Sequence, residues 1–223
     1  MTELPGASPS MDRRRFLTVL GGAGGLAVAW STGAVPAAHA AGAPTANGWP
    51  VLGAGSGALA SYVVEGTNVA VTLLSGETAT VLLHVIRRFH YEVGALEPGQ
   101  VVGHTEQPGP TPPESNHRSG TAVAIRPTQY PSGAKGGLFP HEVAIVRDIL
   151  ADCEGVVRWG GDYARAPKEG HFQIDVRPDS KALARVAHKL DGPHDSAGTT
   201  ADPFTPARRR AAEALAHYQI ATG

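Results

Sequence analysis

The stretch SNHRSGTAVAI, residues 115–125, decides how this sequence is understood. It holds a histidine at position 117, a glycine at position 120 that permits a sharp turn, and then small residues typical of a short strand. Such an order is typical of half of a zinc site, in which the strand adds a carboxylate ligand. The strand position expected to hold that carboxylate is Ala124, which has no donor atom.

The remaining chain predicts an α+β fold, with helices packed on a small antiparallel sheet. We expect strands where β-branched residues alternate with others, and helices where apolar residues repeat at helical spacing. The expected strands are 69–74, 121–125, 155–159 and 171–176, and the expected helices are 77–93, 140–153, 180–190 and 205–221. Residues 98–116, rich in proline, glycine and glutamate, predict a long loop.

The first forty residues predict an export signal. The segment MDRRRFL, residues 11–17, carries a twin-arginine pattern, and an apolar, glycine-rich run follows to Trp30. Ala38-His39-Ala40 is an A-x-A cleavage signal. The apolar run is too short for a membrane span, which needs about 20 apolar residues. We therefore expect twin-arginine export, no stable membrane span after signal removal, and an extracellular or cell-wall-associated protein.

The expected organisation is a signal peptide at 1–40, a linker at 41–48, a domain at 49–190, a linker at 191–204 and a C-terminal helix at 205–221. The chain has 19 Lys and Arg residues and 20 Asp and Glu residues. The expected signal contains three of the basic residues and two of the acidic ones, so the mature chain has a formal net charge of 16 − 18 = −2. Without a basic stripe, we do not expect a nucleic-acid partner. Cys153 lies in an apolar helical pattern, which favours core packing over catalysis.

Two motifs together resemble a known family. Residues Ser115 to Ala124 are similar to S-x-H-x-x-G-x-A-x-D in every fixed letter except the last. Downstream, RWGGDY at residues 158–163 resembles W-G-G-D-[WY] and is followed by the pair His171-Phe172. The family comprises zinc D-Ala-D-Ala carboxypeptidases and dipeptidases, with L-Ala-D-Glu endopeptidases of phage lysins, and the likeness is closest to secreted actinobacterial members. It covers roughly residues 46–176 and implies the D-Ala-D-Ala carboxypeptidase-like (hedgehog/DD-peptidase) fold.

The resemblance also implies the places of the site residues. Family members hold zinc with His, Asp and His, and an acidic residue three positions before the second histidine acts as general base. The ligand histidines correspond to His117 and His171, the ligand Asp to Ala124, and the base to Lys168. The implied substrate cleft comprises Ser115, Trp159, Asp162 and Phe172. The arginine with which the family steadies the substrate carbonyl has no counterpart in residues 98–116.

These substitutions leave two interpretations of the site. Glu169 could serve as a substitute base, and His104, Glu114 or Asp175 could supply a third zinc ligand, with Asp175 the least suitable because it lies far along its strand. Alternatively, Lys168 takes the place of the cation between two neutral histidines.

Two functions of different classes therefore remain open. The first is an active zinc peptidase that hydrolyses peptidoglycan stem peptides or D-amino-acid dipeptides. The second is a degenerate, non-catalytic module that keeps the cleft and binds stem peptide without hydrolysis. The number of lost ligand and base positions favours the second function.

Overall fold

The computed structural model describes residues 43–191 and 202–222. The chain divides into two units, Met1–Ala38 and His39–Gly223, and every described residue belongs to the second unit. The expected export signal at 1–40 and most of the expected linker at 191–204 thus lie outside the described residues.

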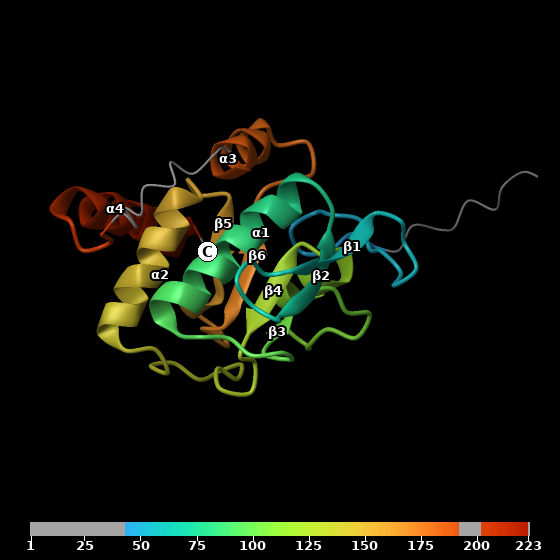
Figure 1. Cartoon of the computed structure of the whole chain (residues 1–223), viewed down its shortest axis with the longest axis horizontal. Helices are drawn as coiled ribbons and strands as arrows, with labels where there is room; N and C mark the ends of the chain where they lie inside the picture. Colours follow the sequence, from blue (N-terminus) through green and yellow to red (C-terminus); the bar gives the residue numbers. More distant parts are fainter. Residues whose placement is uncertain (1–42, 192–201, 223) are drawn as a thin grey trace, which may run out of the picture. The chain divides into compact units, whose positions relative to one another are not determined.

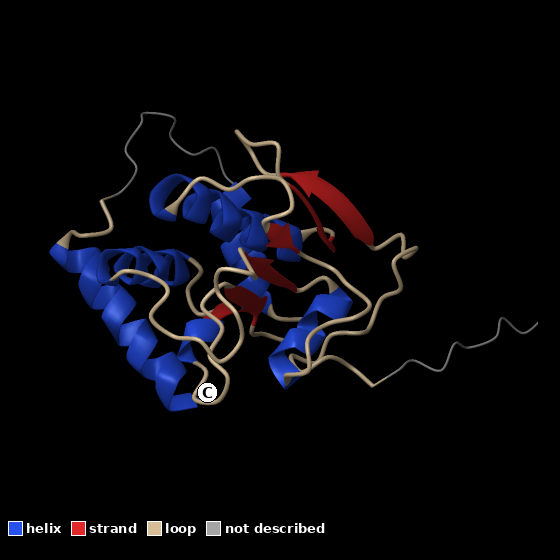
Figure 2. Cartoon of the chain, turned by 90° about the horizontal axis from the view of Figure 1, so that it is seen from below, coloured by secondary structure: helices blue, strands red, loops and turns tan. Residues whose placement is uncertain are grey.

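The described residues form a mixed helix and sheet structure with two small antiparallel sheets, which confirms the α+β class. Strands β1 (Leu59–Val63) and β2 (Ala70–Leu74) form one sheet. The other sheet has the order β3-β4-β6-β5. Its strands are β3 (Val101–Val102), β4 (Ala122–Ile125), β6 (His171–Ile174) and β5 (Val157–Trp159). Figure 2 shows the two-stranded sheet, in red, set apart from the other strands.

The prediction of a single sheet was wrong, because β1 and β3 were not recognised. In β1 small and half-exposed residues give a weak apolar alternation, and the hairpin with β2 supplies its stability instead. The two residues of β3 are too few for any periodic pattern. Strands β2, β4, β5 and β6 lie within the expected ranges.

The four α-helices of the described residues lie at their expected places. They are α1 (Glu77–Arg88), α2 (Pro140–Asp152), α3 (Lys181–Asp191) and α4 (Pro206–Thr222). A π-helical turn, Phe89–Val93, prolongs α1 to the end of the expected helix. Helix α1 contacts β4 and β6 on one side and α3 on another, while α2 contacts α4 (Figure 1). None of these helices is long and apolar enough to cross a membrane.

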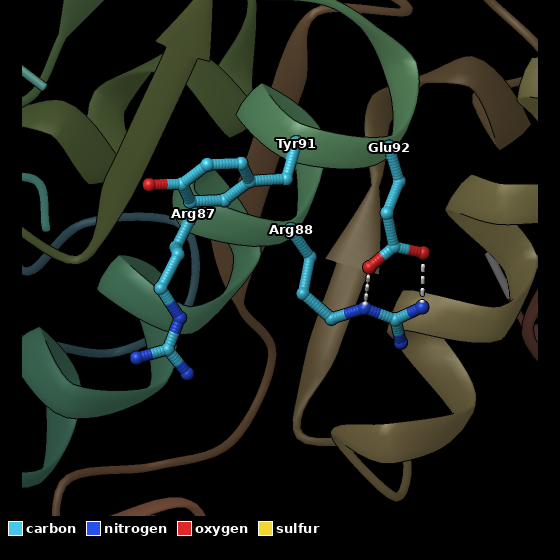
Figure 3. A pocket seen from close by; sticks show the side chains of 4 residues that line it. All are labelled: Arg87, Arg88, Tyr91 and Glu92. Atoms are coloured by element: carbon cyan, nitrogen blue, oxygen red, sulfur yellow. Dashed lines mark hydrogen bonds and ion pairs between the residues drawn. The ribbon is translucent and has the colours of Figure 1, made fainter. Parts of the chain in front are cut away.

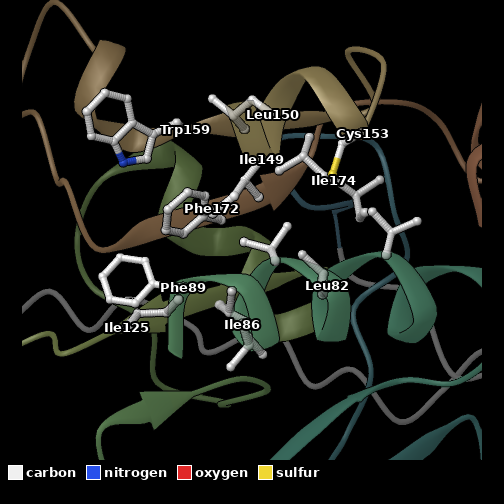
Figure 4. Packing of buried hydrophobic residues seen from close by; sticks show 14 of the residues in the cluster. Leu82, Ile86, Phe89, Ile125, Ile149, Leu150, Cys153, Trp159, Phe172 and Ile174 are labelled. Atoms are coloured by element: carbon white, nitrogen blue, oxygen red, sulfur yellow. The ribbon is translucent and has the colours of Figure 1, made fainter. Parts of the chain in front are cut away.

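The hydrophobic core lies between α1 and one face of the four-stranded sheet. Alternate residues of each strand share a face, so Phe172 and Ile174 of β6 point the same way. Figure 4 shows these two side chains facing Ile86 and Phe89, with Cys153 nearby. The rings of Phe89 and Phe172 meet edge to face at a centroid distance of 6.4 Å. The remaining face of the sheet is therefore left for a different set of side chains.

Buried ion pairs join α1 to α2 and α4. The Arg88 guanidinium donates to Glu92 at 2.6 Å, to Asp148 at 2.8 Å and to Asp152 at 2.7 Å. Figure 3 shows Arg88 turned toward Glu92 beside a cavity of about 400 Å³. Arg208, from the arginine run at the start of α4, donates to Asp148 at 2.6 Å. The Arg208 side chain thus ties α4 to α2.

The segment before the domain is packed rather than a free linker over its described part. The Thr45 side chain is buried, and the Asn47 amide donates to the Thr121 hydroxyl and to the Ile174 carbonyl, each at 2.8 Å. The Trp49 indole donates to the Val176 carbonyl at 2.7 Å. The domain therefore begins at about Thr45, since polar side chains of this segment cover the end of β6.

Candidate functional site

A 3₁₀ helix, Pro112–Ser119, positions His117. The sequence predicted a loop over most of this stretch, but the Thr111 hydroxyl donates to the Glu114 carboxylate at 2.8 Å and begins the helix. Gly120 ends it with a left-handed φ of 69°. A Cβ at Gly120 would lie 2.6 Å from the Leu74 backbone nitrogen, so this turn requires glycine.

The environment of His117 fixes its tautomer. Nδ1 lies 2.7 Å from the Gly103 carbonyl oxygen, which can only accept a hydrogen bond. Nδ1 therefore carries the proton, and Nε2 keeps a lone pair. The ring is buried, with an exposed fraction of 3%. This is the usual arrangement of a metal-binding histidine, in which the nitrogen away from the metal donates to a carbonyl.

Strand β6 positions His171 on the sheet face opposite the core. His171 pairs with Ala124 of β4, and Gln173 pairs with Ala122. Because directly opposed residues point to the same face, the Ala124 methyl is a close neighbour of the His171 ring. The position at which the resemblance implies a carboxylate thus lies beside the second histidine, and it holds only a methyl group.

A buried polar network surrounds His171. The Gln173 side-chain oxygen accepts from Asn116 at 2.8 Å and from the Tyr163 hydroxyl at 2.9 Å, and it lies 3.1 Å from His171 Nε2. Nε2 therefore carries the proton, which leaves a lone pair on Nδ1. Among the described residues, this fully buried Nδ1 has no hydrogen-bond partner. An unpartnered buried acceptor is rare and marks a place where a ligand or cation fits.

The two imidazoles lie together and are both neutral. Their ring centroids are 5.2 Å apart in a T-shaped arrangement. Burial lowers the pKa of His117 to about 4, and the positive charge of Lys168 lowers it further against the hydrogen bond to Gly103. Burial also lowers the pKa of His171 to about 3, aided by the neighbouring His117 and by Lys168. The structure thus brings together the two predicted metal-binding histidines, each with one nitrogen lone pair.

Lys168 and Glu114 form an ion pair beside the histidines. Nζ of Lys168 donates to the Glu114 carboxylate at 2.5 Å, and the exposed fractions of the two side chains are 13% and 6%. Burial alone would raise the pKa of Glu114, but hydrogen bonds from Lys168 and Thr111 outweigh it and lower the pKa to about 2. Glu114 and His117 are three residues apart, so in a 3₁₀ helix they lie one above the other.

The other residues considered as third ligands are engaged elsewhere. The His104 ring nitrogen Nε2 contacts the Leu52 carbonyl at 2.9 Å, and Asp175 accepts from Arg158 at 2.9 Å. Glu114 is held by Lys168. Within residues 43–191 and 202–222, no group of three His, Cys, Asp or Glu side chains gathers closely enough to hold a metal ion.

The described donor set therefore does not fit a catalytic zinc ion, because no third His, Cys, Asp or Glu side chain joins the two imidazoles. A catalytic zinc site adds a third protein ligand and an open position for water. Here the third position is a methyl group, and an ammonium group lies nearby.

Glu169 is committed to a loop rather than to the histidines. Its carboxylate accepts from the backbone amides of Gly136 at 2.8 Å, Gly137 at 2.7 Å and Leu138 at 3.1 Å. The side chain is buried, with 4% exposure. These three bonds occupy the oxygens that a general base would use, so the structure assigns Glu169 a role in holding the loop before α2.

Trp159 and Asp162 line a separate cavity of about 390 Å³, which Lys135, Leu138 and Glu169 also border. Asp162 pairs with both terminal nitrogens of Arg147, whose guanidinium lies 4.9 Å from the Trp159 ring centroid. Neither histidine is among the residues that line this cavity. The predicted site residues thus fall into two groups, the buried histidine pair and this cavity.

Two of the predicted cleft residues have other roles. Phe172 is fully buried in the core on the face of β6 opposite the histidines, so its assignment to the cleft was wrong. The reason is the strand period of two, which separates Phe172 from its neighbour His171. The Ser115 hydroxyl accepts from the Ala46 amide at 2.9 Å and anchors the first described residues of the domain.

Sequence reasoning missed Gln173, Asn116 and Tyr163 as the polar surroundings of His171, and it did not foresee the pairing of Glu114 with Lys168. Two spacings carried a usable signal. His171 and Gln173 are two residues apart on a strand, and Glu114 and His117 are three apart in the 3₁₀ helix. The pairing of Lys168 with Glu114 joins residues 54 positions apart, so no local sequence pattern predicts it.

Comparison of the chain with models of protein families, with curated proteins and with solved structures gives no match.

Proposed function

We propose that this protein is an exported, non-catalytic module of the D-Ala-D-Ala carboxypeptidase-like fold that binds peptidoglycan stem peptide without hydrolysing it. The motif order in the sequence supports the fold, and the convergence of His117 and His171 is consistent with it. The twin-arginine pattern at residues 11–17 supports export to the cell wall.

One observation carries the non-catalytic part of the proposal, the Lys168–Glu114 ion pair next to the histidines. A zinc peptidase needs a carboxylate ligand for the metal and an acidic group to take the proton of the attacking water. The positions implied for these two groups hold Ala124 and Lys168. A methyl group and an ammonium group can do neither task.

The cavity bordered by Trp159 and Asp162 is the proposed place for peptide. Its volume of about 390 Å³ is within the usual range of small-molecule sites, about 300–1,000 Å³. The exposed Lys135 at its border suits the carboxylates that a stem peptide carries. Apolar atoms of Leu138 and Trp159 suit the methyl groups of its alanines.

The test is calorimetric titration of the mature chain, residues 41–223, with a synthetic stem pentapeptide that ends in D-Ala-D-Ala. We expect saturable binding, no hydrolysis by mass spectrometry, and about fivefold weaker binding in Lys135→Ala, the loss of about 1 kcal/mol from one exposed charge pair. Lys181→Ala, a change to an exposed lysine of α3, is the matched control. Equal affinity for a peptide ending in L-Ala-L-Ala, or no binding at all, would contradict the proposal.

The alternative is an active zinc peptidase, and the lone pair on His171 Nδ1 is the observation that favours it. This function requires one equivalent of zinc and release of D-Ala by the wild-type chain. If Glu169 were the base, that activity would disappear in Glu169→Gln. The bonds of Glu169 to three backbone amides argue against this role.

A further inference from the structure

The histidine pair is buried, so charged groups beside it are largely shielded from solvent. His117 and His171 have exposed fractions of 3% and 0%, and their ring centroids are 5.2 Å apart. The charged groups beside them are the Lys168 ammonium and the Glu114 carboxylate. Burying these two charges is unfavourable unless they are paired with good geometry, and their 2.5 Å contact provides that pairing.

The Lys168 ammonium group can serve as a cation for the imidazole nitrogens that keep a lone pair, His117 Nε2 and His171 Nδ1. It carries three N–H donors, of which Glu114 accepts one. The Lys168 backbone is tied to the second histidine, because its carbonyl accepts from the His171 amide at 3.0 Å. Its partner Glu114 lies one turn of the 3₁₀ helix from His117. One cation and one carboxylate thus lie beside the two imidazoles, each tied by the chain to one of them.

We propose that the Lys168 ammonium is the built-in cation of this site and excludes divalent metal from the pair of His117 and His171, with Glu114 as its counter-charge. The exclusion is then an active effect of Lys168, in addition to the missing carboxylate at Ala124. A carboxylate introduced at position 124 would pair with the ammonium before it could bind a metal. This inference does not depend on peptide binding.

The proposal separates two substitutions that would otherwise be expected to act alike. Ala124→Asp supplies a carboxylate beside His171 but leaves the ammonium in place. Lys168→Met removes the charge at similar side-chain length and releases Glu114 toward the histidines. Repulsion between unit charges about 4 Å apart at an effective dielectric of 20 corresponds to about a 1,000-fold change in affinity. Solvent around Lys168, at 13% exposure, reduces this effect, so we expect a change of about 100-fold.

The experiment measures zinc binding to four forms of the mature chain: wild type, Ala124→Asp, Lys168→Met and the double variant. A chromophoric chelator gives affinity, melting temperature with and without zinc gives stability, and the absorption spectrum with Co²⁺ reports tetrahedral coordination. We expect no saturable binding in wild type and one equivalent in the double variant. Ala124→Asp should bind about 100-fold more weakly than the double variant.

Two controls keep the outcome decisive. Adding His117→Ala to the double variant should abolish zinc binding, which shows that the metal sits at the histidines. Lys168→Met alone should show measurable zinc binding, which wild type lacks, and this variant tests the proposal if the double variant does not fold. Stoichiometric zinc in wild type, equal affinity in Ala124→Asp and the double variant, or no gain in Lys168→Met would each overturn the proposal. Stem-peptide binding by wild type is a separate measurement, so either idea can fail alone.

Discussion

Glu169→Gln tests whether the buried glutamate next to the histidine site holds a loop or serves chemistry. The carboxylate accepts three backbone amides, with one oxygen on Gly136 and the other shared by Gly137 and Leu138. Glutamine keeps one carbonyl oxygen, which can serve Gly137 and Leu138. Its NH₂ group would then face the Gly136 amide, so a donor meets a donor and that hydrogen bond is lost.

The cost follows from the number and kind of bonds. A hydrogen bond to a charged group contributes about 1.5–3 kcal/mol, and the two remaining bonds weaken because their acceptor becomes neutral. At 4% exposure, water cannot replace the lost partner. We therefore expect the free energy of unfolding to fall by about 2–3 kcal/mol. If opening of the loop carries the loss, amide exchange at Gly136 and Gly137 should accelerate by about 30- to 150-fold.

The assay is urea unfolding of the mature chain followed by circular dichroism, together with hydrogen exchange of residues 136–138. Glu142→Gln is the matched control, because its half-buried carboxylate accepts one amide, that of Phe139, at 2.7 Å. The control should lose about 1 kcal/mol or less. A loss below about 0.5 kcal/mol in Glu169→Gln, with unchanged exchange, would refute the assignment of this side chain to the loop.

Two further predictions concern the core. Burial raises the pKa of the Cys153 thiol to about 12, so the thiolate is absent at pH 8. A thiol reagent should therefore modify the protein only after urea unfolds it. Rapid labelling of the native protein would contradict the burial of this side chain. Phe172→Ala should lower the free energy of unfolding by about 3–5 kcal/mol, because the ring is fully buried against Phe89. The control Val63→Ala, at a side chain with 67% exposure, should lower it by less than about 0.5 kcal/mol. Similar losses in both variants would place Phe172 outside the core.

Periodic elements were predictable because their signals are local. The apolar spacing of residues 77–93 predicted α1 and its π-helical end, and Pro140 marked the first residue of α2. Strands β4 and β6 were recognised from short runs of small or β-branched residues. Where the local signal is weak, as in the two residues of β3, the pairing with Ala124 and Ile125 creates the strand.

The site was predictable in part. The structure brings His117 and His171 together, and the strand register puts Ala124 opposite His171, while their role as metal ligands stays a prediction. The role of Glu169 was not predictable, since the amides it binds belong to a loop 31 to 33 residues away. Nor could a sequence reveal that Lys168 would find its partner in Glu114.

The sequence by itself determined the α+β class, the main helices and the two histidines, because each depends on residue identity at fixed local spacing. It also determined that position 124 holds alanine, which has no donor atom. Only the tertiary structure decided which carboxylate meets which cation, which face of β6 lies in the core, and which nitrogen lone pairs remain unpartnered. These outcomes depend on distances between segments far apart in the chain, and the pairing of β4 with β6 and the contact of the 3₁₀ helix with β4 set those distances.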